Sequence, residues 1–142
     1  MIVALVGCSG PKLTVPARAR DLYQSDLFRK ARAYAESHAD RWAILSARHG
    51  LLFPDTITPL YERSMRNLGP VERELWRTRT HLALHHAFPR AKAFLFLAGD
   101  SYRCDELLNC TQHGHRDCVL PFEFLLDGLQ IGQRKRWLRE AA

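Results

Sequence analysis

The amino terminus constrains the fold more than any other stretch of this sequence. Residues 2–6 (Ile-Val-Ala-Leu-Val) form an unbroken apolar run, which stops at the turn-forming sequence Gly7-Cys8-Ser9-Gly10-Pro11-Lys12. A short apolar run bounded by Gly and Pro is typical of a strand buried on both faces. Such strands occur mainly in parallel sheets that helices cover on both sides. We therefore predict a helix-covered sheet, with a ligand site beyond the carboxyl ends of its strands.

The rest of the chain alternates between helical and strand patterns. Ser25 is a good N-cap for a helix whose inward side would carry Leu27, Ala31, Tyr34 and His38. Further strands are predicted at 42–46, 92–97 and 118–121, a short helix up to about 108, and longer helices over 70–88 and 131–141. In the last helix Trp137 and Leu138 would face inward and Arg134 outward. The segments 14–21 and 47–62 are predicted loops.

These elements and the chain length predict the architecture. A chain of 142 residues fits a single domain, 1–142, with a core of its own. The alternation of strands and helices predicts an α/β fold, a three-layer α/β/α sandwich with a short, mostly parallel sheet of three to four strands.

Composition indicates a soluble cytoplasmic protein. The sequence is 46% hydrophobic and 25% charged, as in ordinary globular domains. No apolar run approaches the roughly 20 residues that span a bilayer, and the first residues do not resemble a signal peptide. We expect Met1 to begin a mature cytosolic chain with no membrane partner, in which the four cysteines are thiols or ligands rather than disulfides.

Polar residues follow three of the predicted strands and would meet at one edge of the sheet. The small, polar and aromatic residues gathered there are what a pocket for a polar ligand needs. The first strand supplies Gly7, Cys8, Ser9 and Lys12, the second supplies Ser46, His49 and Gly50 with Asp55, Tyr61 and Glu62 on the following loop, and the third supplies Gly99, Asp100 and Tyr102.

Each prominent side chain has a functional and a structural interpretation. His49 is either an acid or base, with a carboxylate of the loop as partner, or a histidine bonded to backbone. Cys8 is either a nucleophile that His49 activates or a buried thiol, and the buried thiol is favoured. Tyr61 and Tyr102 either stack on a base or sugar or pack against the protein.

The sequence predicts no cofactor, but two groups of residues raise the question of a metal. The alternative to no cofactor is a structural zinc ion, bound by Cys104, Cys110, His113 and His115 close to Cys118. Their spacing matches neither paired-cysteine knuckles nor two histidines four apart on a helix. His81 and His85 do stand four apart, and we interpret them as part of a solvated helical face.

Several motifs resemble a small bacterial and phage family of unknown function. The resemblance rests on Gly7-Cys8-Ser9-x-x-Lys12, on residues 16–28 around Leu22-Tyr23, on Leu45-Ser46-Ala47-x-His49-Gly50-Leu51, on Pro54-Asp55 and on Gly99-Asp100-x-Tyr102, and it covers nearly the whole chain. Gly10 stands where lysine or serine is usual. More remotely, residues 45–61 resemble the core motif of the YaaA peroxide-stress proteins, which implies DNA binding and a fold similar to that of uracil-DNA glycosylases. No glycosylase active-site motif is present.

Two functional hypotheses follow from the pocket and the charge. The first is a nucleic-acid- or nucleobase-directed enzyme, a DNA glycosylase-like hydrolase of an N-glycosidic bond in damaged or modified DNA. His49 would polarise the leaving base, while Asp55, Glu62 or Asp100 would position water. The alternative is a non-catalytic DNA-binding protein of oxidative-stress or mobile-element biology. The net charge of +6 favours a nucleic-acid or nucleotide partner, held on the backbone by Arg18, Arg20, Arg29 and Lys30.

Overall fold

Three parallel strands form the centre of the molecule. The structure is a computed structural model, which describes residues 1–8, 12–59, 61, 64–99, 102, 122–126 and 129–141. β1 (Ile2–Gly7) lies between β3 (Arg41–Ser46) and β6 (Ala93–Leu97) and is parallel to both. β4 (Gly50–Leu52) pairs antiparallel with β3, and β7 (Phe122–Glu123) pairs parallel with β6. The sheet order is therefore β4-β3-β1-β6-β7.

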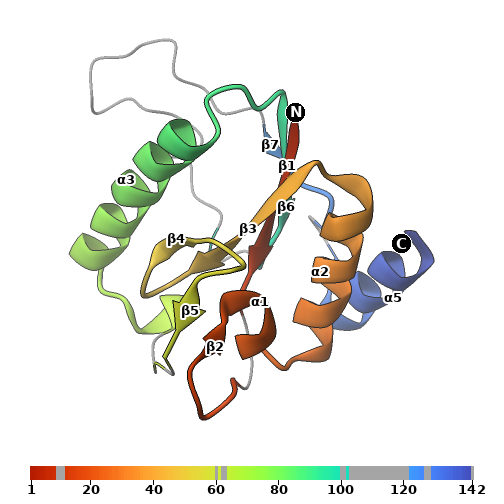
Figure 1. Cartoon of the computed structure of the whole chain (residues 1–142), viewed down its shortest axis with the longest axis horizontal. Helices are drawn as coiled ribbons and strands as arrows, with labels where there is room; N and C mark the ends of the chain where they lie inside the picture. The colour runs from red at the N-terminus through yellow and green to blue at the C-terminus, as the bar shows by residue number, and fades with distance from the viewer. Residues whose placement is uncertain are drawn as a thin grey trace.

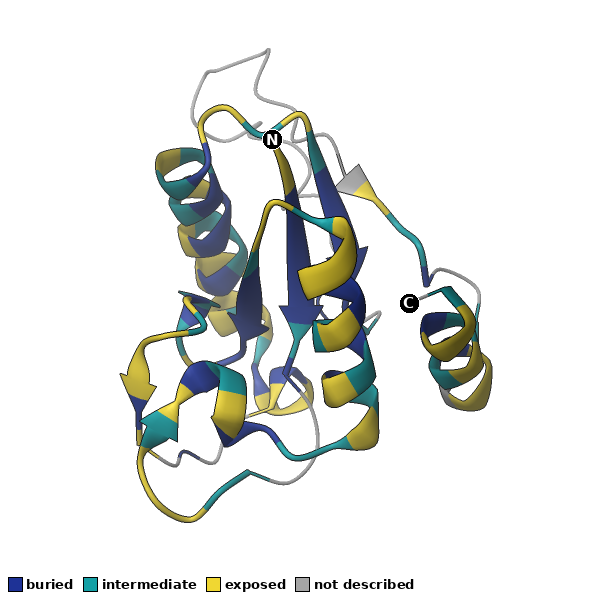
Figure 2. Ribbon diagram, turned by 45° about the vertical axis from the view of Figure 1, so that its right-hand side comes forward, coloured by how far each residue is buried: buried dark blue, intermediate teal, exposed yellow. Residues whose placement is uncertain are grey.

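Helices cover both faces of this sheet, which confirms the predicted α/β architecture. α3 (Pro70–Ala87) lies on one face, and α2 (Asp26–His38) and α5 (Ile131–Ala141) lie together on the other (Figure 1). The side chains of Val3 to Val6 are fully buried, as the unbroken apolar run predicts for a central strand. Buried residues concentrate on the central strands and on the helix faces turned toward them (Figure 2).

Helix boundaries follow the local signals closely. The Ser25 side chain accepts a hydrogen bond from the Phe28 backbone N–H at 3.1 Å, as an N-cap should. α3 begins with Pro70 at its first turn, where the missing N–H costs nothing. Within the described residues, no helix is long and apolar enough to cross a bilayer.

The two predicted loops contain short elements that the sequence pattern does not reveal. The predicted loop 14–21 contains β2 (Ala17–Arg18) and most of the one-turn helix α1 (Ala19–Leu22), and the predicted loop 47–62 contains β4 and β5 (Ile57–Thr58). β2 and β5 pair antiparallel as a separate two-stranded sheet, and a 3₁₀ turn, η1 (Met65–Asn67), precedes α3. Strands of two or three residues show too little alternation to be detected, since pairing with distant segments stabilises them. The predicted strand at 118–121 and most of the short helix before 108 lie outside the described residues.

Two predicted helix orientations are wrong. His38 is exposed and stacks on the Tyr34 ring at 4.1 Å between centroids, while Phe28 and Ala35 join Ala31 and Tyr34 on the buried face of α2. Arg134 is buried rather than exposed, because its Nε donates to the Leu129 carbonyl at 2.7 Å. An arginine stem that returns to its own helix start can be buried without an unpaired guanidinium.

Candidate functional site

A buried cluster of hydroxyl and thiol groups stands at the carboxyl ends of β1 and β3. We call it the tyrosine–cysteine cluster; its members are Cys8, Tyr23, Ser46, Tyr61 and Tyr102. Parallel register places Gly7 beside Leu45, so the residues that follow β1 and β3 meet at the same edge. Gly7 also allows β1 to approach the end of β6, because a side chain there would come within 2.8 Å of the Ala98 Cβ.

Tyr61 links the members of the cluster. Its hydroxyl lies 2.6 Å from the Tyr23 hydroxyl and 2.9 Å from the Ser46 hydroxyl, and it donates to the Cys8 Sγ at 3.5 Å. The Tyr102 hydroxyl closes the other side, 3.1 Å from the Cys8 Sγ and donating to the Cys8 carbonyl at 3.0 Å. Burial, and then the nearby Cys8, raise the pKa of Tyr61 and of Tyr102, so both phenols are neutral at physiological pH. The thiol of Cys8 is buried, as the favoured interpretation predicts.

His49 lies next to this cluster, in the turn between β3 and β4. Its backbone N–H donates to the Ser46 hydroxyl at 3.2 Å, and its ring stands edge-on to Tyr61 with 5.2 Å between centroids. The Nε2 atom is buried and has no hydrogen-bond partner among the described residues. Burial, followed by the charges of Arg48 and Arg79, lowers the pKa of His49, so the imidazole is neutral at pH 7.

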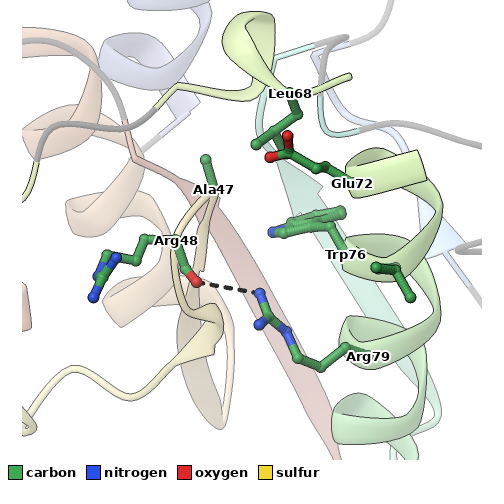
Figure 3. A pocket seen from close by; sticks show the side chains of 7 residues that line it. Ala47, Arg48, Leu68, Glu72, Trp76 and Arg79 are labelled. Carbon is green, nitrogen blue, oxygen red and sulfur yellow. Dashed lines mark hydrogen bonds between the residues drawn. The ribbon is translucent and has the colours of Figure 1, made fainter. Parts of the chain in front are cut away.

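α3 holds this turn in place. The Trp76 indole donates to the Ser46 carbonyl at 2.7 Å. Arg79 donates to the Arg48 carbonyl at 3.2 Å (Figure 3). Gly50 has φ +73°, which favours glycine, and a side chain there would come within 3.0 Å of the Thr80 hydroxyl. Trp76 and Arg79 are positioning residues that the sequence analysis does not identify, because nothing in a helical pattern shows which distant carbonyl a side chain will reach.

A groove of about 430 Å³ runs between α3 and the residues before His49. Ala47 and Arg48 form one wall, with Trp76 and Arg79 opposite, and the Arg48 side chain points away from α3 (Figure 3). The complete lining is Ala47, Arg48, Leu68, Glu72, Leu75, Trp76 and Arg79.

Lys12 supplies a positive charge to the same region. The backbone of Lys12 forms a single antiparallel β-bridge with that of Tyr23. The Lys12 Nζ lies 4.9 Å from the centre of the Tyr61 ring and 5.8 Å from the centre of the Tyr23 ring. At these distances the ammonium group is attracted to both aromatic faces. Lys12 and Tyr61, both predicted at this edge of the sheet, thus lie close together in the structure.

Asp55 does not join the other predicted residues. β4 runs antiparallel to β3, so the chain returns toward the start of β3 and leaves Asp55 beside Arg41 and Trp42 in a second groove. There the carboxylate pairs with Arg20 at 2.6 Å. The expected grouping of Asp55 with His49 is therefore wrong. Ser9, Glu62 and Asp100 lie outside the described residues.

Most of the predicted nucleic-acid contacts have partners within the protein. Arg20 pairs with Asp55, Lys30 pairs with Asp26 at 2.9 Å, and Arg29 donates to the Gln24 amide oxygen at 2.7 Å. Arg18 is exposed on β2. These cations are spread over α1, α2 and β2 rather than gathered around the tyrosine–cysteine cluster.

The interpretation of His81 and His85 as solvated is wrong for His81. Its side chain is only 2% exposed, and the two Nε2 atoms lie 3.1 Å apart. Burial, and then His81, lower the pKa of His85, so the His85 ring is neutral at pH 7. In the described part of the chain no three potential metal ligands come together. Cys104, Cys110, His113, His115 and Cys118 lie outside it.

Comparison with known proteins identifies the family. The sequence profile of the family of unknown function DUF6884 matches residues 3–140. The chain belongs to this family. The chain is also 45% identical over 42 residues to the uncharacterized protein YfjM of Bacillus subtilis. The aligned segment is 30% of the present chain and 28% of the length of YfjM. No solved structure matches the chain.

Proposed function

We propose that this DUF6884 protein is an enzyme that hydrolyses an N-glycosidic bond of a nucleotide or of modified nucleic acid. The observation that carries the proposal is the unpaired, buried Nε2 of a neutral His49 beside the tyrosine–cysteine cluster. A buried polar atom without a partner costs free energy, and a ligand that donates to or accepts from it removes that cost. The place also fits, because ligands of parallel sheets bind beyond the carboxyl ends of the strands.

The chemistry of the surrounding groups favours a planar, polar ligand with a negative charge. Tyr61 is held by hydrogen bonds at its hydroxyl, and Lys12 stands above its ring. A neutral imidazole can donate a hydrogen bond to a ring atom of a nucleobase, and an ammonium group can pair with a phosphate. The remote resemblance of residues 45–61 to YaaA proteins supports the same substrate class.

In the proposed reaction, water attacks the anomeric carbon and the bond from that carbon to the base nitrogen breaks. The base leaves with the bonding electrons, stabilised by a hydrogen bond from the neutral His49 ring, and it takes up the proton that the attacking water loses. Ser46 orients His49 through its backbone N–H, and Tyr61 does so through the T-shaped contact between the two rings. Glu62 and Asp100 remain the predicted residues for positioning water, since Asp55 faces Arg20 instead.

The test is a turnover and binding assay with labelled single- and double-stranded DNA carrying uracil or deaminated or oxidised bases, together with free nucleosides and nucleotides. We expect release of free base, with His49→Gln lowering kcat by ~100- to 10,000-fold while the folded state is retained. His86→Gln is the matched control and should leave kcat as in the wild type, because His86 is exposed near the end of α3.

Salt-sensitive DNA binding without base release would contradict the proposal and support the non-catalytic DNA-binding alternative. Full activity in His49→Gln would contradict the role of His49. The ion pairs of Arg20 and Lys30 make the alternative less favoured, since part of the positive charge is already compensated.

A further inference from the structure

The outer face of α3 carries an apolar stripe that is exposed in the described part of the structure. Val71, Leu75 and Leu82 are 70%, 65% and 49% exposed. They belong to the exposed large apolar residues in the described part of the chain. At about 100° per residue these three positions span only about 40° of the helix circumference. The opposite side of the helix, with Trp76, Thr80 and Leu84, packs into the protein.

The spacing of this stripe is that of a helix–helix seam. Val71, Leu75, Thr78 and Leu82 follow one another at intervals of four, three and four residues. Apolar residues at alternating intervals of three and four form the contact line of paired helices, and three of these four residues are apolar, with the half-exposed Thr78 as the fourth. α3 already packs into the protein through its inner face. Apolar side chains on its outer face contribute to stability only when another surface buries them.

The charges beside the stripe show which surface fits. Glu72 and Glu74 flank its first half, and Arg79 and His86 flank its second half; all four side chains are exposed. Antiparallel pairing of two α3 helices about a two-fold axis places Val71 against Leu82 and Leu75 against Thr78. On one flank it brings Glu72 of each copy to Arg79 of the other, so the face is complementary to itself.

We propose that the exposed face of α3 is the interface of an antiparallel homodimer. Glu72, Leu75 and Arg79 also line the groove beside the turn that carries His49. The partner helix therefore closes the outer side of this groove. The seam is about two heptads long, so the association is weak and depends on protein concentration.

The test is analytical ultracentrifugation of the full chain over a wide concentration range. The mass of the wild type should rise from 16.4 kDa toward twice that value. Leu75→Glu should stay at the monomer mass throughout. Ile57→Glu is the matched control, because Ile57 on β5 is also 65% exposed but lies off this face, and it should associate like the wild type.

Charge reversal tests the antiparallel register. Glu72→Arg alone and Arg79→Glu alone should each weaken self-association, because every flanking pair becomes a like-charge pair. An equimolar mixture of the two variants should form a heterodimer, since both flanking pairs are then of opposite charge. Circular dichroism of each variant shows whether it remains folded.

A wild type that stays at 16.4 kDa at every concentration would overturn the proposal. So would a dimer that persists in Leu75→Glu or is lost in Ile57→Glu. A mixture of the charge variants that associates no better than each alone would overturn the antiparallel register.

Discussion

At the residue scale, the tyrosine–cysteine cluster depends on one hydroxyl. Tyr61 contacts Tyr23, Ser46 and Cys8 through the same oxygen, from a position that is separated from each of them by 15 or more residues in the sequence. Such a network is favourable only when its members are all paired, because an unpaired buried hydroxyl loses its hydration without compensation. Removing the Tyr61 hydroxyl oxygen alone therefore tests how much the cluster contributes to stability.

We predict that Tyr61→Phe lowers the free energy of unfolding by about 1–3 kcal/mol, since it leaves the Tyr23 hydroxyl without this partner. Urea unfolding measures the difference. Tyr34→Phe removes the same atom from a tyrosine whose hydroxyl makes no hydrogen bond within the described part of the chain, and it should cost much less. Equal losses in the two variants would show that the network contributes nothing of its own.

At the element scale, α2 and α3 differ in what fixes them. α2 begins with a side-chain cap at Ser25, whereas α3 begins at Gly69 and Pro70 without one and is held by contacts of Trp76 and Arg79 with the β3–β4 turn. The start of α2 is a local feature, and the placement of α3 is a tertiary one. Substitutions at the two helices should therefore act differently.

Ser25→Ala should destabilise the protein by about 1 kcal/mol, because the Phe28 N–H loses its acceptor. Thermal unfolding at one scan rate reports the change. Ser37→Ala provides the comparison, since Ser37 is exposed in the same helix and its hydroxyl donates to the Ala33 carbonyl. If Ser37→Ala costs as much as Ser25→Ala, the N-cap is not what stabilises the start of α2.

At the scale of the whole molecule, the folded state keeps two histidines neutral. Burial and then Arg48 and Arg79 lower the pKa of His49, and burial and then His81 lower that of His85. In the unfolded chain both return to about 6.5, so the unfolded state binds more protons once the pH falls below that value. Stability that is present above about pH 6.5 is lost as the pH falls through the folded-state pKa values.

We therefore expect the free energy of unfolding to fall between about pH 7.5 and about pH 5.5, and to fall less steeply in the double variant His49→Gln/His85→Gln. Denaturant titration at each pH measures the slope. A double variant with an unchanged slope would contradict the role of the two half-buried histidines.

The sequence by itself determined the framework of this protein. The apolar run of β1, the N-cap of α2 and Pro70 at the start of α3 are local signals, and each marks the element that the structure contains. The positions of Gly7, Cys8, Ser46 and His49 near one edge of the sheet follow from the same signals, because parallel strands end together. That part of the candidate site could be predicted.

Only the tertiary structure decided which side chains meet there. β4 turns back along β3 and separates Asp55 from His49. Tyr61 and Trp76 reach Ser46 from two other segments, and Tyr23 reaches the Tyr61 hydroxyl from a third. Likewise, His81 is buried by what packs against α3, although its helical spacing alone is compatible with a solvated face. Contacts between distant segments depend on packing and hydrogen bonds that form only in the folded chain, and no local pattern carries that information.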